Sequence, residues 1–250
     1  MIMGINYKKI LKENFPARFQ TIKDKKLLFI VLGSLGDFDS FEYCQQLASK
    51  MDNLTDRGIE VFVTAIGQKS ALKRFCSFTQ FPEERMELRS NRDLHAQLGL
   101  NDGLNFHVSP ILNILFMCLG LKSPGTIREV LRGYVGDMKA PRIFSTESNI
   151  EIRTKIPFVK SLFSKFGDKT HLLPFELATL RLINMIEILS NWSIYVPFVK
   201  HINQRGGTFL FDDDGSLIYT FFASSLLNYS ETMSLPLTFL DKLDIMEKST

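Results

Sequence analysis

An apolar run followed by an amphipathic stretch marks the first regular structure predicted in this chain. Residues 27–32 are all apolar, which predicts a buried strand, and the turn residues Gly33 and Gly36 follow them. Asp39 and Glu42 lie three positions apart just before the amphipathic stretch, which is the spacing of a capping box. We therefore expect a strand, a turn and a helix whose N-terminus is capped by Asp39.

The same pattern recurs farther along the chain. Residues 59–66 form a second β-rich apolar run that ends at Gly67, and residues 69–81 have the pattern of a helix that stops before Pro82. Two consecutive strand–helix units predict parallel neighbouring strands, joined by right-handed crossovers in a sheet that is covered on both faces.

Two further β-rich runs near the C-terminus flank a tight turn. Residues 207–212 and 216–221 are separated by Asp213, Asp214 and Gly215, which is the pattern of an antiparallel hairpin. We interpret the aspartates of this turn as solvated residues and expect a closing helix over residues 231–240. This order of elements predicts an α/β protein with a thioredoxin-like fold.

Composition narrows the class of protein. The chain has 250 residues, of which 45% are hydrophobic, and a formal net charge of +3. It can therefore bury a full core, and a fibrous or disordered protein is excluded. Three cysteines without paired spacing favour a reducing compartment. Residues 1–15 lack the apolar core of a signal peptide, and we predict a short surface helix there. We expect the cytoplasm as its location, with the surface of a membrane as an alternative; the resemblance described next adds a plastid stroma.

Six segments of the chain carry a resemblance to one known group of proteins. They are VLGSLGDFDSFEYCQQL, VTAIGQKSALKRFCSFTQFP, LHAQLGL, SPGTIREVLRGYVGD, PFELATLRLINMIEIL and QRGGTFLFDDDGSLIY. Together they resemble the peroxiredoxin-like branch of the AhpC/TSA family, and within it members from cyanobacteria and plastids. The six segments extend over most of the chain. The resemblance implies a thioredoxin-like fold and, in the redox-active relatives, antioxidant chemistry carried out by cysteine.

The catalytic turn of the redox-active relatives reads Gly-Cys-x-x-Cys-Arg-Glu, and an overlay without gaps places Gly36 and Glu42 on its Gly and Glu. The two Cys positions then fall on Asp37 and Ser40, and the Arg position falls on Phe41. Reduction of a peroxide needs a sulfur nucleophile that becomes a sulfenic acid. The resemblance therefore implies that the turn has lost its redox pair.

Cys44 lies one helical turn after Ser40 and offers two interpretations. It could be a displaced nucleophile near the old active-site turn, or a small residue that packs the helix against the sheet. We favour packing, because a nucleophilic cysteine normally lies at a helix N-terminus, where the dipole lowers its pKa. Cys76 and Cys118 have apolar neighbours and are expected in the core.

In thioredoxin-fold enzymes a cis-proline precedes the strand that faces the active-site turn, and the resemblance implies that a Gly-Gly pair replaces it here. Gly206 and Gly207, followed by Thr208, match that position. Glycines would let the backbone approach the turn over residues 37–40 closely. The alternative is a glycine-rich entry into a strand.

Residues 104–203 exceed what a minimal thioredoxin-like fold requires, so we interpret them as a mostly helical insertion in a single domain spanning residues 1–250. The apolar stretch over residues 111–121 is shorter than the ~18–20 residues that span a bilayer. We expect it to be a helix buried in the core; the alternative is a helix that faces a partner.

A basic amphipathic stretch lies inside the insertion. Lysine and arginine outnumber aspartate and glutamate by ten to five over residues 122–169. We predict a surface for a protein partner or an anionic membrane, formed by Lys155, Phe158, Lys160, Phe163 and Lys165. The alternative is an ordinary surface helix with its apolar side on the core.

Other site classes have little support in the sequence. His95, His107, His171 and His201 have no ligand-like spacing, so we predict no metal and no cofactor. The small net charge and the lack of aromatic-basic motifs argue against nucleic-acid binding. Two hypotheses remain: a redox-inactive binding or scaffold protein, and a thiol-dependent peroxidase that uses Cys44 and an external thiol.

Overall fold

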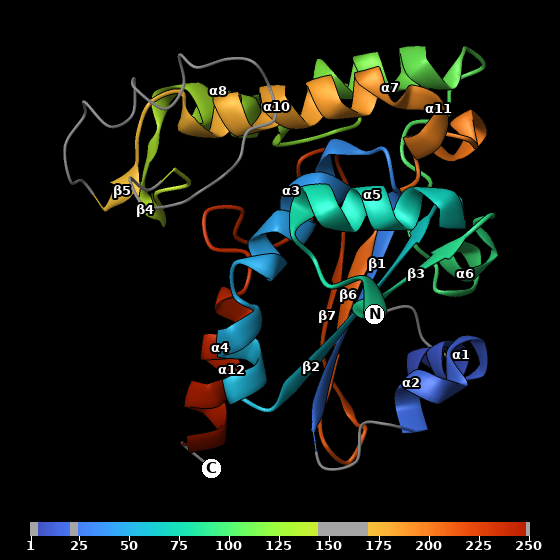
Figure 1. The fold of residues 1–250 in the computed structure, drawn as a ribbon, viewed down its shortest axis with the longest axis vertical. Helices are drawn as coiled ribbons and strands as arrows, with labels where there is room; N and C mark the ends of the chain where they lie inside the picture. The colour runs from blue at the N-terminus through green and yellow to red at the C-terminus, as the bar shows by residue number, and fades with distance from the viewer. Residues whose placement is uncertain (1–4, 21–24, 145–169, 249–250) are drawn as a thin grey trace.

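A mixed five-stranded sheet forms the centre of the protein (Figure 1). The structure is a computed structural model that describes residues 5–20, 25–144 and 170–248. The strand order is β3-β2-β1-β6-β7, with β1, β2 and β3 parallel and β6 and β7 antiparallel. The strands are β1 (Lys26–Ser34), β2 (Ile59–Ile66), β3 (Met86–Arg89), β6 (Gly207–Phe211) and β7 (Leu217–Phe222). The predicted parallel pair, hairpin and thioredoxin-like α/β fold are confirmed.

The central strand β1 is buried on both faces, so its side chains alternate between two cores. Leu28 and Ile30 point into the larger core, and Phe29 and Val31 point into the smaller one. Both neighbours of β1 are themselves paired, so β1 lies at the centre of the sheet. Because it is buried on both faces, its sequence is apolar throughout rather than alternately apolar and polar.

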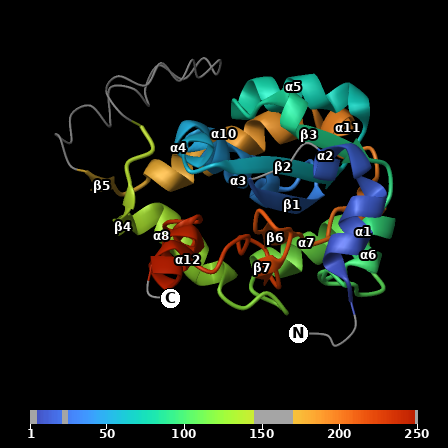
Figure 2. The same cartoon turned by 90° about the horizontal axis from the view of Figure 1, so that it is seen from below.

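Helices cover both faces of the sheet, as the view from below shows (Figure 2). One face carries α3 (Phe38–Ala48), α4 (Met51–Asp56), α5 (Lys69–Thr79) and α12 (Thr238–Lys248), and the other carries α1 (Tyr7–Asn14), α2 (Pro16–Gln20) and α6 (Asp93–Gln97). A short 3-10 helix, η1 (Glu83–Arg85), precedes β3. The closing helix predicted over residues 231–240 is wrong in position, because the chain from 231 to 237 forms turns before α12 begins.

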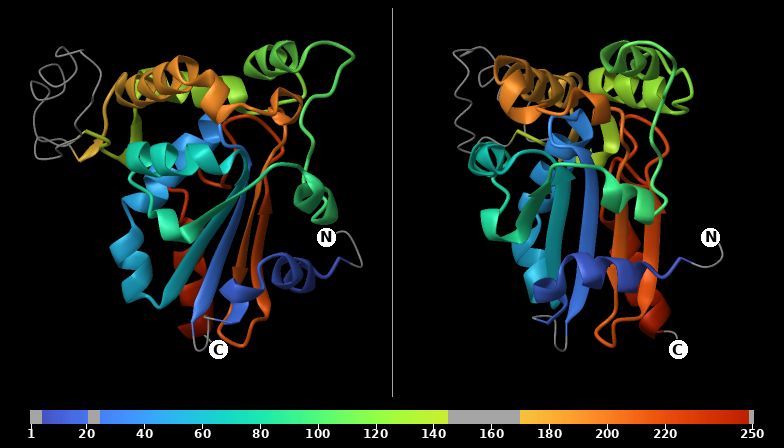
Figure 3. Two further views of the ribbon diagram at one scale, coloured as in Figure 1. Left: turned by 45° about the vertical axis from the view of Figure 1, so that its right-hand side comes forward. Right: turned by 90° about the vertical axis from the view of Figure 1, so that its right-hand side faces the viewer.

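The insertion forms a helical layer across the end of the sheet at which β1 leads into α3 (Figures 1 and 3). Its elements are α7 (Pro110–Cys118), α8 (Thr126–Val135), β4 (Asp137–Pro141), β5 (His171–Leu172), α10 (Glu176–Ser190), α11 (Trp192–Tyr195) and η2 (Val199–His201). It has a small core of its own around Leu172, Leu177 and Leu180. The layer therefore lies directly above the turn that the sequence singles out.

The expectation that residues 111–121 are buried is wrong for one side of the helix. In α7 only Asn113 and Met117 are buried, whereas Ile111, Leu115 and the C-cap Leu119 are each more than half exposed. Within the described ranges, no helix is long and apolar enough to cross a membrane.

Candidate functional site

Helix α3, which follows the turn after β1, has a different N-cap residue from the one predicted. Helix α3 begins at Phe38, and its N-cap is Asp37, whose side chain accepts a hydrogen bond from the backbone N–H of Asp39 at 3.4 Å. The predicted capping box of Asp39 and Glu42 is therefore wrong. Both of these carboxylates are buried and used elsewhere.

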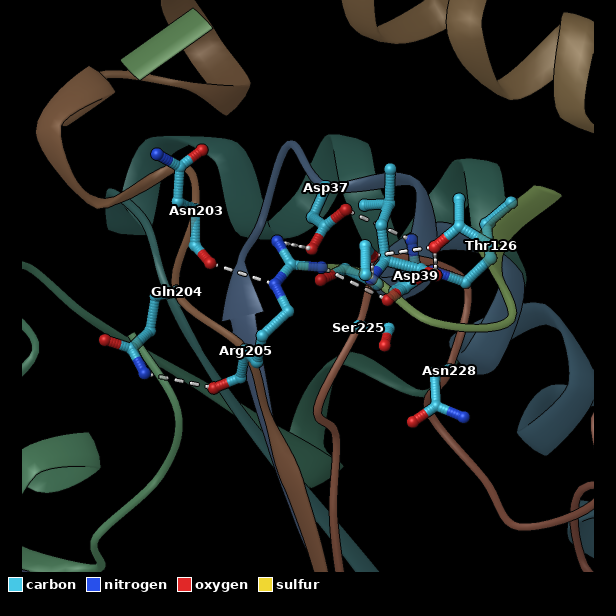
Figure 4. Close-up of polar contacts among 12 residues, drawn as sticks. Asp37, Asp39, Thr126, Asn203, Gln204, Arg205, Ser225 and Asn228 are labelled. Carbon is cyan, nitrogen blue, oxygen red and sulfur yellow. Dashed lines mark hydrogen bonds and ion pairs between the residues drawn. The ribbon is translucent and has the colours of Figure 1, made fainter. Parts of the chain in front are cut away.

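Arg205 lies against both aspartates of this turn (Figure 4). Its Nη2 is 2.7 Å from a carboxylate oxygen of Asp37, and its Nη1 is 3.2 Å from Asp39. Its other donors bond the backbone oxygens of Asn203 at 2.9 Å and Ile202 at 3.2 Å. Four acceptors therefore hold the guanidinium. The side chain of Arg205 is only 1% exposed.

Asp37 and Asp39 share the one guanidinium of Arg205. Both carboxyl groups are buried, which disfavours their ionised forms. Burial raises the pKa of Asp37, although Arg205 opposes the shift. The pKa of Asp39 is raised well above its usual value, by burial first and then by the negative charge of Asp37. Asp39 also accepts a hydrogen bond from the backbone N–H of Leu227 at 2.9 Å. The turn is therefore a closed polar cluster in which burial makes the ionised form of Asp39 costly.

Ser40, on which the sequence overlay places the second cysteine of redox-active relatives, also makes a contact within the protein. Its hydroxyl donates a hydrogen bond to the backbone oxygen of Ser34 at 2.8 Å, which ties the start of α3 to the end of β1. The side chain is buried. Like Asp37, it makes a contact within the turn.

Glu42 links the turn to the insertion. It accepts hydrogen bonds from Arg181 of α10 at 2.7 and 3.2 Å and from the hydroxyl of Tyr229 at 3.0 Å. Arg181 also bonds the Glu129 carboxylate of α8 at 2.8 Å, and Glu129 in turn accepts from Arg132 at 2.9 Å. A buried chain of charge-assisted hydrogen bonds therefore fastens α8 and α10 to α3.

Close backbone contacts complete the connection between the turn and the insertion. A side chain on Gly33 would collide with the backbone oxygen of Gln204, and a side chain on Gly36 would collide with Val196 after α11. Only glycine permits this approach, because a Cβ would fall inside van der Waals distance. The insertion therefore packs directly on the turn.

The predicted facing glycines contact β1 rather than residues 37–40. Gly206 lies against the backbone oxygen of Val31, and Gly207 pairs with Val31 in the sheet register. The hydroxyls of Thr208 and Tyr43 are hydrogen-bonded at 3.1 Å. The contact with the turn comes instead from Arg205, the residue before the glycines. Sequence reasoning missed Arg205, for which the only signal was an arginine beside a glycine pair.

Cys44 is wholly buried in the larger core. Burial raises the pKa of its thiol well above the usual value, and the nearby Cys76 adds to the shift. Burial likewise raises the pKa of Cys76 to about 12. The thiolate is the reactive form of cysteine, and burial at these two positions favours the neutral, unreactive thiol over the thiolate.

Cys118, which the sequence placed in the core, is only partly buried. It packs against a buried cluster that includes Met117 and Leu226, and Phe38, the first residue of α3, packs against the same cluster. Burial raises its pKa, and the negative charge of Asp37 adds to that shift. The surroundings of Cys118 therefore also favour the neutral thiol.

The other predicted sites have different outcomes. Lys155, Phe158, Lys160, Phe163 and Lys165 lie outside the described residues, so the predicted partner surface remains a prediction. Asp212, Asp213 and Asp214 bring their carboxylates together in the hairpin turn. Two of these carboxylates accept backbone hydrogen bonds within the turn, from Asp213 at 3.0 Å and from Ser216 at 2.6 Å, as expected of a solvated turn.

Comparison with known proteins gives the family of the chain. No curated protein and no solved structure matches it. The family described as AhpC/TSA antioxidant enzyme matches residues 46–225, which includes β2, the insertion and the hairpin. The match begins after Cys44, so it does not include the turn of Asp37 and Ser40. Because it extends over well more than half of the 250 residues, the chain belongs to the AhpC/TSA family.

Proposed function

We propose that this chain is a redox-inactive member of the AhpC/TSA family that serves as a binding or scaffold protein. The turn that holds catalytic cysteines in redox-active relatives has become a structural junction between the sheet and the helical insertion. The insertion carries the binding surface, for a protein partner or an anionic membrane.

One observation supports the proposal above all: the polar side chains of the turn bind other groups of the same protein. Asp37 and Asp39 pair with Arg205, and Ser40 bonds the backbone of Ser34. No sulfur stands at either position, and carboxylates and hydroxyls cannot form a sulfenic acid. The positive charge of Arg205, which would stabilise a thiolate, is neutralised by carboxylates instead.

The second candidate is a thiol-dependent peroxidase that uses Cys44 and is recycled by an external thiol. Its support is the description of the family as an antioxidant enzyme. The wholly buried position of Cys44 and its raised pKa oppose it, because a peroxide must reach a thiolate.

Oxidation by peroxide, followed by mass spectrometry, separates these candidates. The folded protein is treated with hydrogen peroxide in the presence of dimedone, which traps sulfenic acids, and Cys44, Cys76 and Cys118 are compared with the same protein unfolded in urea. We expect Cys44 to stay unmodified in the folded protein and to react only after unfolding. Rapid trapping at Cys44 in the folded protein, at substoichiometric peroxide, would contradict the proposal.

A further inference from the structure

The outer side of α7 and α8 is covered by large apolar side chains. They recur every four residues along α7 and after four and then three residues along α8, which places them on one side of each helix. Each is more than half exposed, and a soluble protein seldom exposes a contiguous apolar patch of this kind without using it. The residues that define this surface, called the apolar face below, are Ile111, Leu115, Leu119, Ile127, Leu131 and Tyr134.

The stripes on the two helices adjoin each other. Gly120, just after α7, lies so close to Ile127 that a Cβ there would be 3.0 Å from its side chain. At the other end of α8, Tyr134 contacts the exposed Phe175 edge to face, with ring centroids 6.0 Å apart. The apolar face therefore extends from α7 across α8 to the start of α10, along the helical layer in Figure 3.

The charges around this surface have one sign. Between Gly103 and Gly136 the single acidic residue is Glu129, which is buried and paired with Arg132 and Arg181. The exposed charged residues there are Lys122 and Arg128, and neither forms an ion pair with a described residue. An anionic surface would therefore meet cations without meeting a carboxylate.

The helix α7 also offers a partner almost no hydrogen-bonding groups. From residue 110 to residue 121 the only polar side chain besides the thiol of Cys118 is Asn113, which is buried and bonded to the backbone of Phe106 at 3.2 Å. Protein interfaces usually contain about one hydrogen bond per 100–200 Å². Acyl chains require none, so this composition fits lipid better than protein.

We propose that the apolar face docks on an anionic membrane surface, with its aliphatic side chains entering the interface and Lys122 and Arg128 contacting anionic headgroups. The inference rests on the proposed function, since it names the surface and the partner of the insertion. A second copy of the chain fits less well. A two-fold contact would bring the cations of both copies together without an acidic residue to pair with them.

Flotation of the full-length protein with phosphatidylcholine vesicles, with and without phosphatidylglycerol, tests this proposal. We expect the protein to float only with the anionic vesicles. The double variant Lys122→Asn/Arg128→Gln should weaken partitioning about 25-fold, roughly fivefold for each charge. Asn is chosen because Lys122 has a φ of 47°, which Asn tolerates. The double variant Leu115→Ser/Leu131→Ser should weaken partitioning about tenfold or more.

Matched controls alter similar exposed residues elsewhere. Lys69→Gln/Lys73→Gln removes two exposed charges from α5, and Leu235→Ser removes one exposed leucine from the C-terminal segment. Both should float like the wild type, and all variants should keep the wild-type circular dichroism and unfolding midpoint. Equal flotation with both vesicle types, or full flotation of both test variants, would overturn the proposal.

Two further outcomes would assign the surface to another occupant and also overturn the proposal. One is a dimer, measured by light scattering, that the leucine variant dissociates while the wild type fails to float. The other is binding of a soluble protein that both test variants lose, again without flotation. Peroxide oxidation of Cys44 would contradict the proposed function while leaving flotation unchanged, so the two failures are distinguishable.

Discussion

Arg205 holds its guanidinium 2.7 Å from the carboxylate of Asp37. The arginine lies just after the insertion and just before β6, and the aspartate is the N-cap of α3. The positive charge at this turn is therefore paired with a buried carboxylate. The contact joins the segment that follows the insertion to the turn that follows β1.

The first prediction concerns the strength of this contact. Arg205→Met should lower the free energy of unfolding by about 3–5 kcal/mol, because it leaves two buried carboxylates without their cation. Urea unfolding at neutral pH measures the loss.

A compensating variant keeps this prediction specific. Neutralising the partners in Arg205→Met/Asp37→Asn/Asp39→Asn should recover much of the lost stability, since no uncompensated charge remains. A triple variant as unstable as Arg205→Met alone would show that packing, rather than charge, accounts for the loss.

The second prediction concerns the pH dependence of stability. The pKa of Asp39 is raised well above its usual value by burial and by Asp37. An acid with a raised folded-state pKa binds more protons when folded, so its contribution to stability is present at low pH. It is lost as pH rises from about 4 through the raised pKa.

Asp39→Asn removes this titration. The free energy of unfolding of the wild type minus that of the variant should therefore fall as pH is raised from about 4 through the raised pKa, measured by urea unfolding in steps of pH. Asp213→Asn, which removes an exposed carboxylate outside the buried cluster, is the control for the loss of one aspartate. A difference that rises with pH for Asp39→Asn would mean that Arg205 outweighs burial.

The third prediction concerns the close approach of the insertion to β1. Gly33→Ala should destabilise the protein by about 2–4 kcal/mol, because its Cβ would collide with the rigid backbone oxygen of Gln204. Gly67→Ala is the matched control: its Cβ would meet side-chain atoms of Leu35 at 3.1 Å, which can adjust. Equal unfolding midpoints for the two variants would argue against the contact.

The fourth prediction concerns the basic stretch of the insertion. If Lys155, Lys160 and Lys165 add to membrane or partner binding, replacing all three with glutamate should weaken binding. Binding by the wild type should fall as salt is raised, since exposed charges are screened beyond about 8–10 Å at physiological ionic strength. Flotation with anionic vesicles and a pull-down with purified candidate partners measure both effects. Full recovery of the triple variant in both assays would leave the apolar face as the only candidate.

The sheet could be predicted because its apolar runs are local signals. Residues 59–66 were predicted as a strand and form β2 with the same bounds. The four-residue strand β3 has no comparable run, since Glu87 and Arg89 interrupt it. The exposed side of α7 escaped prediction for another reason: uniform apolarity gives no period that separates a buried face from an exposed one.

The sequence predicted the residues of the turn itself but not the residues that contact it from elsewhere in the chain. The overlay of one segment places the cysteine positions of redox-active relatives on Asp37 and Ser40, and this assignment stays a prediction because the family match begins at residue 46. The role of Arg205 could not be predicted, because it is far from the turn in sequence and its contact depends on how the insertion folds back over the sheet. The ion pair of Glu42 with Arg181 escaped prediction for the same reason.

Peroxide turnover by the purified protein separates a redox-inactive chain from a one-cysteine peroxidase. Hydrogen peroxide consumption is followed with dithiothreitol as the external thiol, for the wild type, Cys44→Ser, Cys118→Ser and a variant with all three cysteines replaced by serine. We expect the wild type to consume peroxide no faster than the variant without cysteines. Catalytic turnover by the wild type that disappears in Cys44→Ser would contradict this expectation and establish a one-cysteine peroxidase.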